Sequence, residues 1–276
     1  MIKHIFNILN PIPGLQQIWN ARELLINLVK RNISVRYKGS MLGVLWSIVQ
    51  PLMMLCIYTY VFSVVFKARW GENVGSSKGG FAIILFCGMA LYSVFSESIT
   101  LSSTQITSNV NFVKKVVFPL QLLPLAQVLS SFVLGGIWLI LLLFGAVFIF
   151  GNISWSMLLL PLVLLPFFLF TLGRAFFVSS LTVYIRDVPH VLSVVLQIFF
   201  FLTPIFYPVS AVPESFRKFL MVNPLTYMIE QTRMVMLYAQ IPDWRFAAIS
   251  FALGIGIFIL GFGWFNKTQK GFADVI

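Results

Sequence analysis

The chain contains one long stretch, from Val116 to Gly173, in which no residue carries a charge. This stretch is too long for one helix across a bilayer, because about 20 residues at about 1.5 Å each cover a hydrocarbon core about 30 Å thick. It must turn back on itself, and we predict the turn at residues 151–155, where Gly, Asn and Ser interrupt the apolar run. This feature predicts a chain that lies in lipid rather than in water.

The composition also favours a membrane protein. Of the 276 residues, 59% are hydrophobic and 10% are charged, whereas about a quarter of a soluble domain is charged. None of the apolar stretches has a polar face wide enough to meet water, which argues against soluble core helices. We predict an all-α integral membrane protein with six transmembrane helices, at residues 43–66, 81–101, 120–149, 157–183, 191–207 and 246–265.

Residues 1–42 are polar and basic, with a single acid, Glu23. They hold no apolar run, so we expect no cleavable signal peptide and expect the first span to act as its own signal. Apolar residues recur at helical spacing from Leu24 to Ile33, with basic residues on the other side. This pattern predicts an amphipathic helix at the membrane interface, and an ordinary packed helix is the alternative.

Residues 208–244 mix apolar and charged residues and include four prolines. We predict that they form two short re-entrant helices between spans five and six, which enter the membrane without crossing it. Asn223 can cap the second of these helices. Pro224 suits its first turn, where a missing N–H costs nothing.

Six crossings would place both termini on one side of the membrane. With the termini inside, twelve Lys or Arg lie on the cytoplasmic side and seven outside, so the positive-inside rule favours cytoplasmic termini. We detect no second domain and no internal repeat. We therefore predict a single transmembrane domain, 1–276, made of a cytoplasmic N-terminal segment (1–42), a six-span bundle (43–265) and a cytoplasmic tail (266–276).

The chain shows no energy source of its own. It has no G-x-x-x-x-G-K-[ST] phosphate loop, so ATP, if it is used, must be hydrolysed by another subunit. Ion-driven carriers usually hold several ionisable residues at mid-membrane, whereas here only Glu97 and Arg174 fall within predicted spans, and these two could satisfy each other. The two histidines and two cysteines do not cluster, so we expect no metal site and no cofactor bound by this chain. We predict a transport subunit that is not itself an enzyme.

A partner ATPase would have to contact this chain through an element that is short, rigid and polar. Residues 109–119, between the second and third predicted spans on the cytoplasmic side, meet that description. A solvated loop whose lysines follow the positive-inside rule is the alternative. The candidate coupling residues are Asn109, Asn111, Phe112, Lys114 and Lys115.

The passage of a transporter should be lined by side chains that are neither lipid-like nor fully charged. Such residues recur at helical spacing in the first and fifth predicted spans, and aromatic rings among them could stack on sugar rings. Most phenylalanines of a membrane protein face lipid or core, so a packing role is the alternative for any one ring. The candidate lining residues are Ser47, Gln50, Met54, Tyr58, Gln197, Phe201 and Pro204.

Several segments resemble the permease subunits of bacterial polysaccharide ABC exporters, which carry O-antigen, capsule or teichoic acid polymers. They follow the expected order over nearly the whole chain, which is more specific than any single motif. The segments are 35–46 (VRYKGSMLGVLW), 50–54 (QPLMM), 111–115 (NFVKK), 118–119 (FP), 184–188 (YIRDV), 203–208 (TPIFYP) and 222–225 (VNPL).

The resemblance implies a homodimer with two copies of a cytoplasmic ATP-binding subunit, which would hold ATP and Mg. It implies that residues 111–115 form the coupling helix, with the basic N-terminal helix beside it. It also implies a periplasmic gate made by short helices at 213–220 and 224–238. The candidate gate residues are Tyr207, Pro208, Pro213 and Pro224.

Substrates of this family are polymers on an undecaprenyl diphosphate lipid, or capsule chains on other lipids. From their position at the cytoplasmic mouth, we expect Arg31, Arg36 and Lys38 to meet the diphosphate, since cations pair with phosphate oxygens. Anchoring to anionic lipid of the inner leaflet is the alternative.

We therefore expect a channel-forming subunit that moves lipid-linked polysaccharide, with O-antigen as the expected polymer, from cytoplasm to periplasm. Its partners would be a second copy, the ATPase, the substrate and membrane lipids, and not nucleic acid. The alternatives are an ABC exporter for capsule or teichoic acid, or for drugs or small lipids. A membrane-embedded glycosyl- or acyltransferase is disfavoured because the eight acids and two histidines do not cluster.

Overall fold

The computed structural model describes residues 12–67, 70, 78–114, 118–151 and 154–276. Within these residues, all the regular secondary-structure elements are helices. Five helical segments there are long and apolar enough to cross a membrane, namely Gly43–Val65, Lys78–Ser103, Leu122–Phe150, Trp155–Tyr184 and Trp244–Val275. A sixth apolar helix, α9, is shorter and covers Val188–Leu202. The chain is a multi-pass α-helical membrane protein.

The helices follow one another with short connections. In chain order they are α2 (Ile12–Asn20), α3 (Arg22–Tyr37), η1 (Gly43–Leu45), α4 (Trp46–Thr59), η2 (Tyr60–Val65), α5 (Lys78–Ser103), η3 (Thr107–Asn109), α6 (Val110–Lys114), α7 (Leu122–Phe150), η4 (Trp155–Leu159), α8 (Leu160–Tyr184), α9, η5 (Val209–Ala211), α10 (Glu214–Val222), α11 (Pro224–Met236), α12 (Trp244–Thr268), η6 (Gln269–Gly271) and α13 (Phe272–Val275). The η2 segment is a π-helix, which makes the first span irregular at its end.

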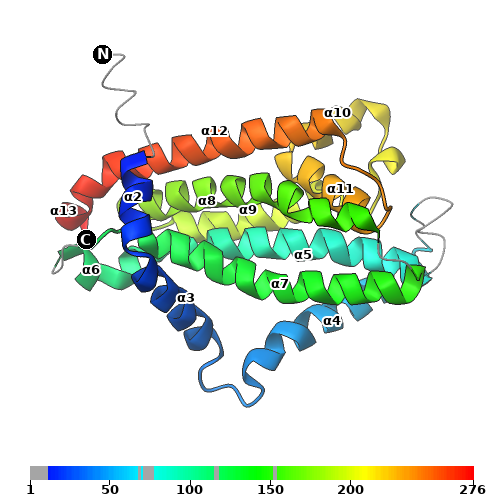
Figure 1. The fold of residues 1–276 in the computed structure, drawn as a ribbon, viewed down its shortest axis with the longest axis horizontal. Helices are drawn as coiled ribbons and strands as arrows, with labels where there is room; N and C mark the ends of the chain where they lie inside the picture. Colours follow the sequence, from blue (N-terminus) through cyan, green and yellow to red (C-terminus); the bar gives the residue numbers. More distant parts are fainter. Residues whose placement is uncertain (1–11, 68–69, 71–77, 115–117, 152–153) are drawn as a thin grey trace.

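The central helix of the bundle is α5, most of which is buried. It contacts α4, α7, α8, α9 and α11. The short helices α10 and α11 lie at one end of the bundle, and α6 and α13 lie at the opposite end (Figure 1). By contrast, few residues of α4 are buried, and this helix extends away from the body of the bundle (Figure 1).

Glycines let α8 and α12 approach each other along most of their length. Gly173 on α8 lies so close to Gly261 on α12 that a methyl group at position 261 would overlap the Gly173 carbonyl. Gly254 lies in the same way against the backbone of Pro166. Close backbone approach of this kind provides van der Waals contact, on which helix association depends in lipid.

Two helix ends were predicted correctly from the residues at those positions. The turn predicted at residues 151–155 begins at Gly151, whose φ of 74° suits glycine and whose N–H donates to the Val147 carbonyl. Residues 152–153 lie outside the described part of the chain. At the second site, Asn223 caps α11 by accepting the Leu225 N–H at 3.1 Å, as predicted.

One predicted boundary is wrong. The fifth span was expected to reach residue 207, but α9 ends at Leu202 and Thr203 is extended. The reason is Pro204, since the residue before a proline is disfavoured in helical backbone. The segment after α9 instead turns into the protein, where Ile205 and Phe206 are buried.

Both ends of the chain add helices to the predicted spans. The predicted N-terminal amphipathic helix is α3, preceded by the unpredicted helix α2. One side of α3 packs on α7 through the buried Leu28, so the packed-helix alternative describes this side, and its place at a membrane surface stays a prediction. At the other end, residues 266–276 continue helically, and Phe272 packs against Phe265 with ring centroids 5.5 Å apart.

Candidate functional site

The predicted coupling element is a short helix, α6, between α5 and α7. Phe112 turns inward and stacks on Phe118, with ring centroids 4.6 Å apart, whereas Asn111 and Lys114 are exposed. Lys115 lies outside the described residues. The inward ring fixes α6 to the bundle and leaves a small polar surface at the end of the molecule, beside α13.

The three basic residues expected at the cytoplasmic mouth lie in different surroundings. The Arg31 guanidinium donates to the side-chain oxygen of Asn109 at 3.5 Å, which links α3 to the residues just before α6. Lys38 is exposed at the end of α3. Arg36 instead forms an ion pair with Glu97 of α5. The structure therefore brings Arg31 to the coupling element and assigns Arg36 a partner within the chain.

Glu97 does not pair with Arg174, the partner that the sequence offered as one that could satisfy it. It pairs with Arg36 and also accepts the Ser131 hydroxyl at 2.9 Å. Partial burial opposes the charge on Arg36, but the hydrogen bond to Glu97 and its negative charge outweigh that effect and raise the pKa of Arg36. The pairing with Arg174 was wrong because sequence spacing does not tell which helix faces which.

The candidate lining residues of the first span differ in burial along α4. Ser47 is buried, and its hydroxyl donates to the Val44 carbonyl at 2.6 Å. Its own carbonyl accepts the Trp138 indole N–H at 3.0 Å, which ties α4 to α7. Gln50 and Met54 are exposed. Gln50 and Met54 are therefore exposed further along α4, while Ser47 helps to attach the start of this helix to α7.

The candidate lining residues in and after α9 also differ in burial. Gln197 and Phe201 are exposed on α9. Pro204 is buried in the segment that follows. Tyr58 of α4 packs against Phe206 of this segment, with ring centroids 5.2 Å apart. The contact joins α4 to the end of α9, so these two helices share one side of the bundle.

The candidate gate residues gather at the end of the bundle that carries α10 and α11 (Figure 1). The Tyr207 hydroxyl donates to the Phe201 carbonyl at 2.9 Å, which folds the segment after α9 back onto that helix. Pro208 precedes η5, Pro213 precedes α10, and Pro224 begins α11. Each proline therefore stands at a helix start, where its fixed φ is compatible with the turn.

A buried cation at this end was missed by the sequence prediction. Arg233 of α11 is fully buried, and its guanidinium donates to the carbonyls of Pro204 at 2.8 Å and Ile205 at 3.2 Å. It also pairs with Glu230 and lies over the ring of Trp70, with 4.4 Å from Cζ to the ring centroid. The available signal was a charged pair three residues apart within a largely apolar helix.

A metal centre finds no support in this arrangement. Within the described ranges, no three His, Cys, Asp or Glu side chains gather at one place. The polar groups that converge in this part of the chain are hydroxyls, amides and paired charges, which hold helices together.

With this geometry in place, comparison with known proteins identifies the family. The ABC-2 type transporter family matches residues 23–237, from α3 to α11. The chain belongs to the ABC-2 type transporter family. The resemblance to ABC exporter permeases that the motifs indicated is therefore confirmed.

Similar proteins match over nearly the whole chain. The chain is 28% identical over 257 residues to the O-antigen export system permease protein RfbA of Klebsiella pneumoniae, covering 92% of this chain and 95% of that protein. It is 29% identical over 267 residues to a protein of the same name from Myxococcus xanthus, covering 95% and 98%. The polysialic acid transport protein KpsM of Escherichia coli is 22% identical over 213 residues, covering 74% and 77%. These relatives carry the names of transport proteins.

Proposed function

We propose that this chain is the membrane-spanning subunit of an ATP-driven exporter that moves lipid-linked O-antigen from the cytoplasm to the periplasm across the bacterial inner membrane. The observation that carries the proposal is the similarity to two proteins named as O-antigen export permeases over 92% and 95% of this chain. The polysialic acid transport protein is less similar and matches a smaller share, so O-antigen is favoured over a capsule polymer.

The placement of the elements supports a transport role. The polar surface of α6 and the proline-rich segment with α10 and α11 lie at opposite ends of the bundle (Figure 1). An ATP-driven exporter needs two such positions, one that contacts the cytoplasmic ATPase and one at which the substrate leaves. The central helix α5 connects them, because it runs from beside α11 to the turn before α6.

The passage forms between two copies of the chain in this proposal. In a single copy, α4 has few buried residues and exposes Gln50, while α9 exposes Gln197. An amide at mid-span is expensive in contact with lipid, which favours a place in a polar passage or an interface. A homodimer that pairs the exposed sides of α4 and α9 would cover both amides.

In the proposed topology, α9 is the fifth of six crossings and both termini are cytoplasmic. The helix has 15 residues, or about 22 Å, which is short for a core of about 30 Å. The buried segment that follows it would complete the crossing, since non-helical backbone is tolerated at membrane depth where protein surrounds it. The helices α10 and α11 would then be re-entrant on the periplasmic side.

The energy would come from two copies of a cytoplasmic ATP-binding subunit that holds ATP and Mg. We infer that α6 seats on this subunit, with Asn111 and Lys114 as its exposed contacts. A movement of α6 driven by this subunit would reach α3 through the hydrogen bond between Asn109 and Arg31. Lys38, which is exposed, and Arg31 are the cations best placed to meet a lipid diphosphate, because Arg36 already has Glu97 as its partner.

Deletion and complementation test the proposal. A strain that lacks this chain should lose surface O-antigen and accumulate lipid-linked polymer on the cytoplasmic side, and the wild-type chain should restore export. A matched strain with an inactive partner ATPase should show the same accumulation. Normal surface polymer in the deletion strain, or polymer lost without accumulation inside, would contradict the proposal.

A further inference from the structure

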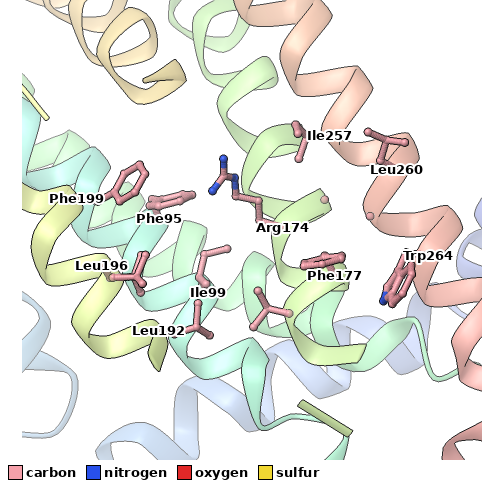
Figure 2. A pocket seen from close by; sticks show the side chains of 14 residues that line it. Phe95, Ile99, Arg174, Phe177, Leu192, Leu196, Phe199, Ile257, Leu260 and Trp264 are labelled. Atoms are coloured by element: carbon pink, nitrogen blue, oxygen red, sulfur yellow. The ribbon is translucent and has the colours of Figure 1, made fainter. Parts of the chain in front are cut away.

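An open groove of about 550 Å³ lies between α5, α8, α9 and α12. Its volume is in the range of small-molecule sites, which is about 300–1,000 Å³. The walls are apolar apart from one residue, as Figure 2 shows, and include Phe95, Phe177, Leu196 and Trp264. The groove is open at the side, because Leu260 at its edge is 61% exposed. A hydrocarbon chain is the kind of occupant that such walls favour.

Arg174 of α8 is the one charged residue of the groove. Its Cζ lies 4.5 Å from the centroid of the Phe170 ring, and its Nε is buried with no hydrogen-bond acceptor among the described residues. No carboxylate in the described part of the chain pairs with it. A guanidinium in a membrane helix without an anion is costly, and such residues usually mark a binding site or a substrate path.

The depth of Arg174 restricts which anion could meet it. Arg174 lies ten residues before Tyr184, the end of α8, which is about 15 Å along the helix. That distance is half of a hydrocarbon core about 30 Å thick. Its side chain also extends toward Phe170, away from that end. The headgroup of a resident phospholipid stays at the membrane surface, whereas a lipid that crosses between leaflets must bring its phosphate past this depth.

The groove lies on the opposite side of α9 from the predicted passage. Leu192 and Phe199 line the groove, whereas Gln197 and Phe201 are not part of it and are exposed. At 100° per residue these two pairs occupy opposite faces of one helix. One helix therefore has a face for a polar polymer and a face for an apolar chain.

We propose that this groove binds the lipid anchor of the exported polymer, with its hydrocarbon chain on the apolar walls and its phosphate group at Arg174. Arginine and phosphate form bidentate, charge-assisted hydrogen bonds, which would satisfy the buried Nε and neutralise both charges at mid-membrane. The inference rests on the proposed function, which supplies an anionic lipid that crosses the bilayer.

Photo-crosslinking tests the occupant directly. A photoreactive phenylalanine replaces Leu260 at the edge of the groove or, as the control, Ile255, which is exposed on the same helix but does not line the groove. The complex with its ATPase, in vesicles, is irradiated with a radiolabelled polyprenyl diphosphate. Position 260 should be labelled about tenfold more than position 255, and Arg174→Gln should remove this excess, as expected for about 1.4 kcal/mol of binding.

Three results of this experiment would overturn the inference. The first is equal labelling at the two positions. The second is stronger labelling by phosphatidylglycerol than by the diphosphate, which would make the groove a site for resident lipid. The third is a crosslink from position 260 to a second copy of the chain, which would make the groove an interface.

Export measurements separate this inference from the proposed function. Val195→Trp, which fills the groove, and Arg174→Gln should lower surface polymer about tenfold. Arg174→Lys, which keeps the charge but loses the bidentate contact, should export more than Arg174→Gln and less than the wild type. Ile255→Trp should stay near wild type, and all four variants should reach the membrane and retain the ATPase. If the wild-type chain restores export and Arg174→Gln does so equally, this inference fails alone. If the wild-type chain restores no export, the proposed function fails, and diphosphate labelling at position 260 still reports on the groove.

Discussion

The Arg233 guanidinium is fully buried, and its Nη1 lies 2.7 Å from Oε1 of Glu230 on the same face of α11. The same guanidinium holds the carbonyls of Pro204 and Ile205 after α9, and its Nε donates to the Ile84 carbonyl of α5 at 3.3 Å. One side chain therefore joins the candidate gate to the central helix. Because these contacts satisfy a buried charge, the gate segment and the start of α5 should move as one unit.

Arg233→Met should destabilise the protein by about 3–5 kcal/mol, because it leaves several buried carbonyls and Glu230 without their partner. The control is Lys218→Met on the exposed side of α10. Thermal unfolding of the purified protein in detergent measures the difference. If Arg233→Met unfolds at the same temperature as Lys218→Met, the central role of Arg233 is refuted.

Gly261→Ala should destabilise the protein, because the added methyl group meets the backbone of Gly173 and pushes α12 away from α8. We expect a loss of about 1–3 kcal/mol, as for overpacking in a core. Gly256→Ala on the same helix is the control, since a methyl group there meets nothing within 4 Å. The control should be neutral or slightly stabilising, because alanine favours the helix. Equal unfolding temperatures for the two variants would argue against close packing at Gly261.

Arg36 and Glu97 should show an interaction energy of about 1 kcal/mol or less in a double-mutant cycle, because both side chains are partly exposed. The variants are Arg36→Gln, Glu97→Gln and the pair. Since the pKa of Arg36 is raised, its contribution is fully present below the usual arginine pKa and is lost only as pH rises through the higher value. The interaction energy should therefore not fall between neutral and mildly alkaline pH.

The control cycle combines Lys38→Gln with Glu97→Gln, because Lys38 is exposed and has no ion pair with Glu97. This second cycle should give no interaction energy. Denaturation of the purified protein measures both cycles. Equal values for the two would mean that the Arg36 pair adds nothing specific.

Lys114→Glu should reduce co-purification of the ATP-binding subunit and lower export, because it reverses the charge on the exposed side of α6. The matched control is Lys267→Glu, an exposed lysine near the end of α12. A pull-down of the tagged chain, followed by quantification of the bound ATPase, compares the two. Loss of the ATPase in both variants, or in neither, would place the contact outside α6.

The spans were predictable from the sequence because each is a local property of about 20 residues. The turn at Gly151 and the cap at Asn223 were predictable for the same reason, since a left-handed turn and an N-cap depend on one residue and its neighbours. The end of α9 at Leu202 was also visible in Pro204, although the apolar run beyond it concealed the break.

The pairing of charges was not predictable. The sequence left Arg174 as a partner that could satisfy Glu97, whereas the structure pairs Glu97 with Arg36 from the N-terminal segment. Likewise, the charged pair of Glu230 and Arg233 in an apolar helix singled out Arg233, but it did not show which carbonyls from two other parts of the chain would surround it. Each pairing depends on the rotation of one helix against another, which residue spacing along a single helix does not determine.

The sequence alone determined that the chain lies in lipid, roughly where it crosses, and that it resembles ABC exporter permeases, because hydrophobicity, turns and motifs are written in consecutive residues. The tertiary structure decided that Arg36 forms an ion pair with Glu97 and that Arg174 faces an apolar groove without an anion. In a medium that does not hydrate charges, a buried charge needs a partner, and for Glu97 and the Arg233 guanidinium partners come from other segments of the chain. That partner is therefore a property of the packed bundle and not of any one segment.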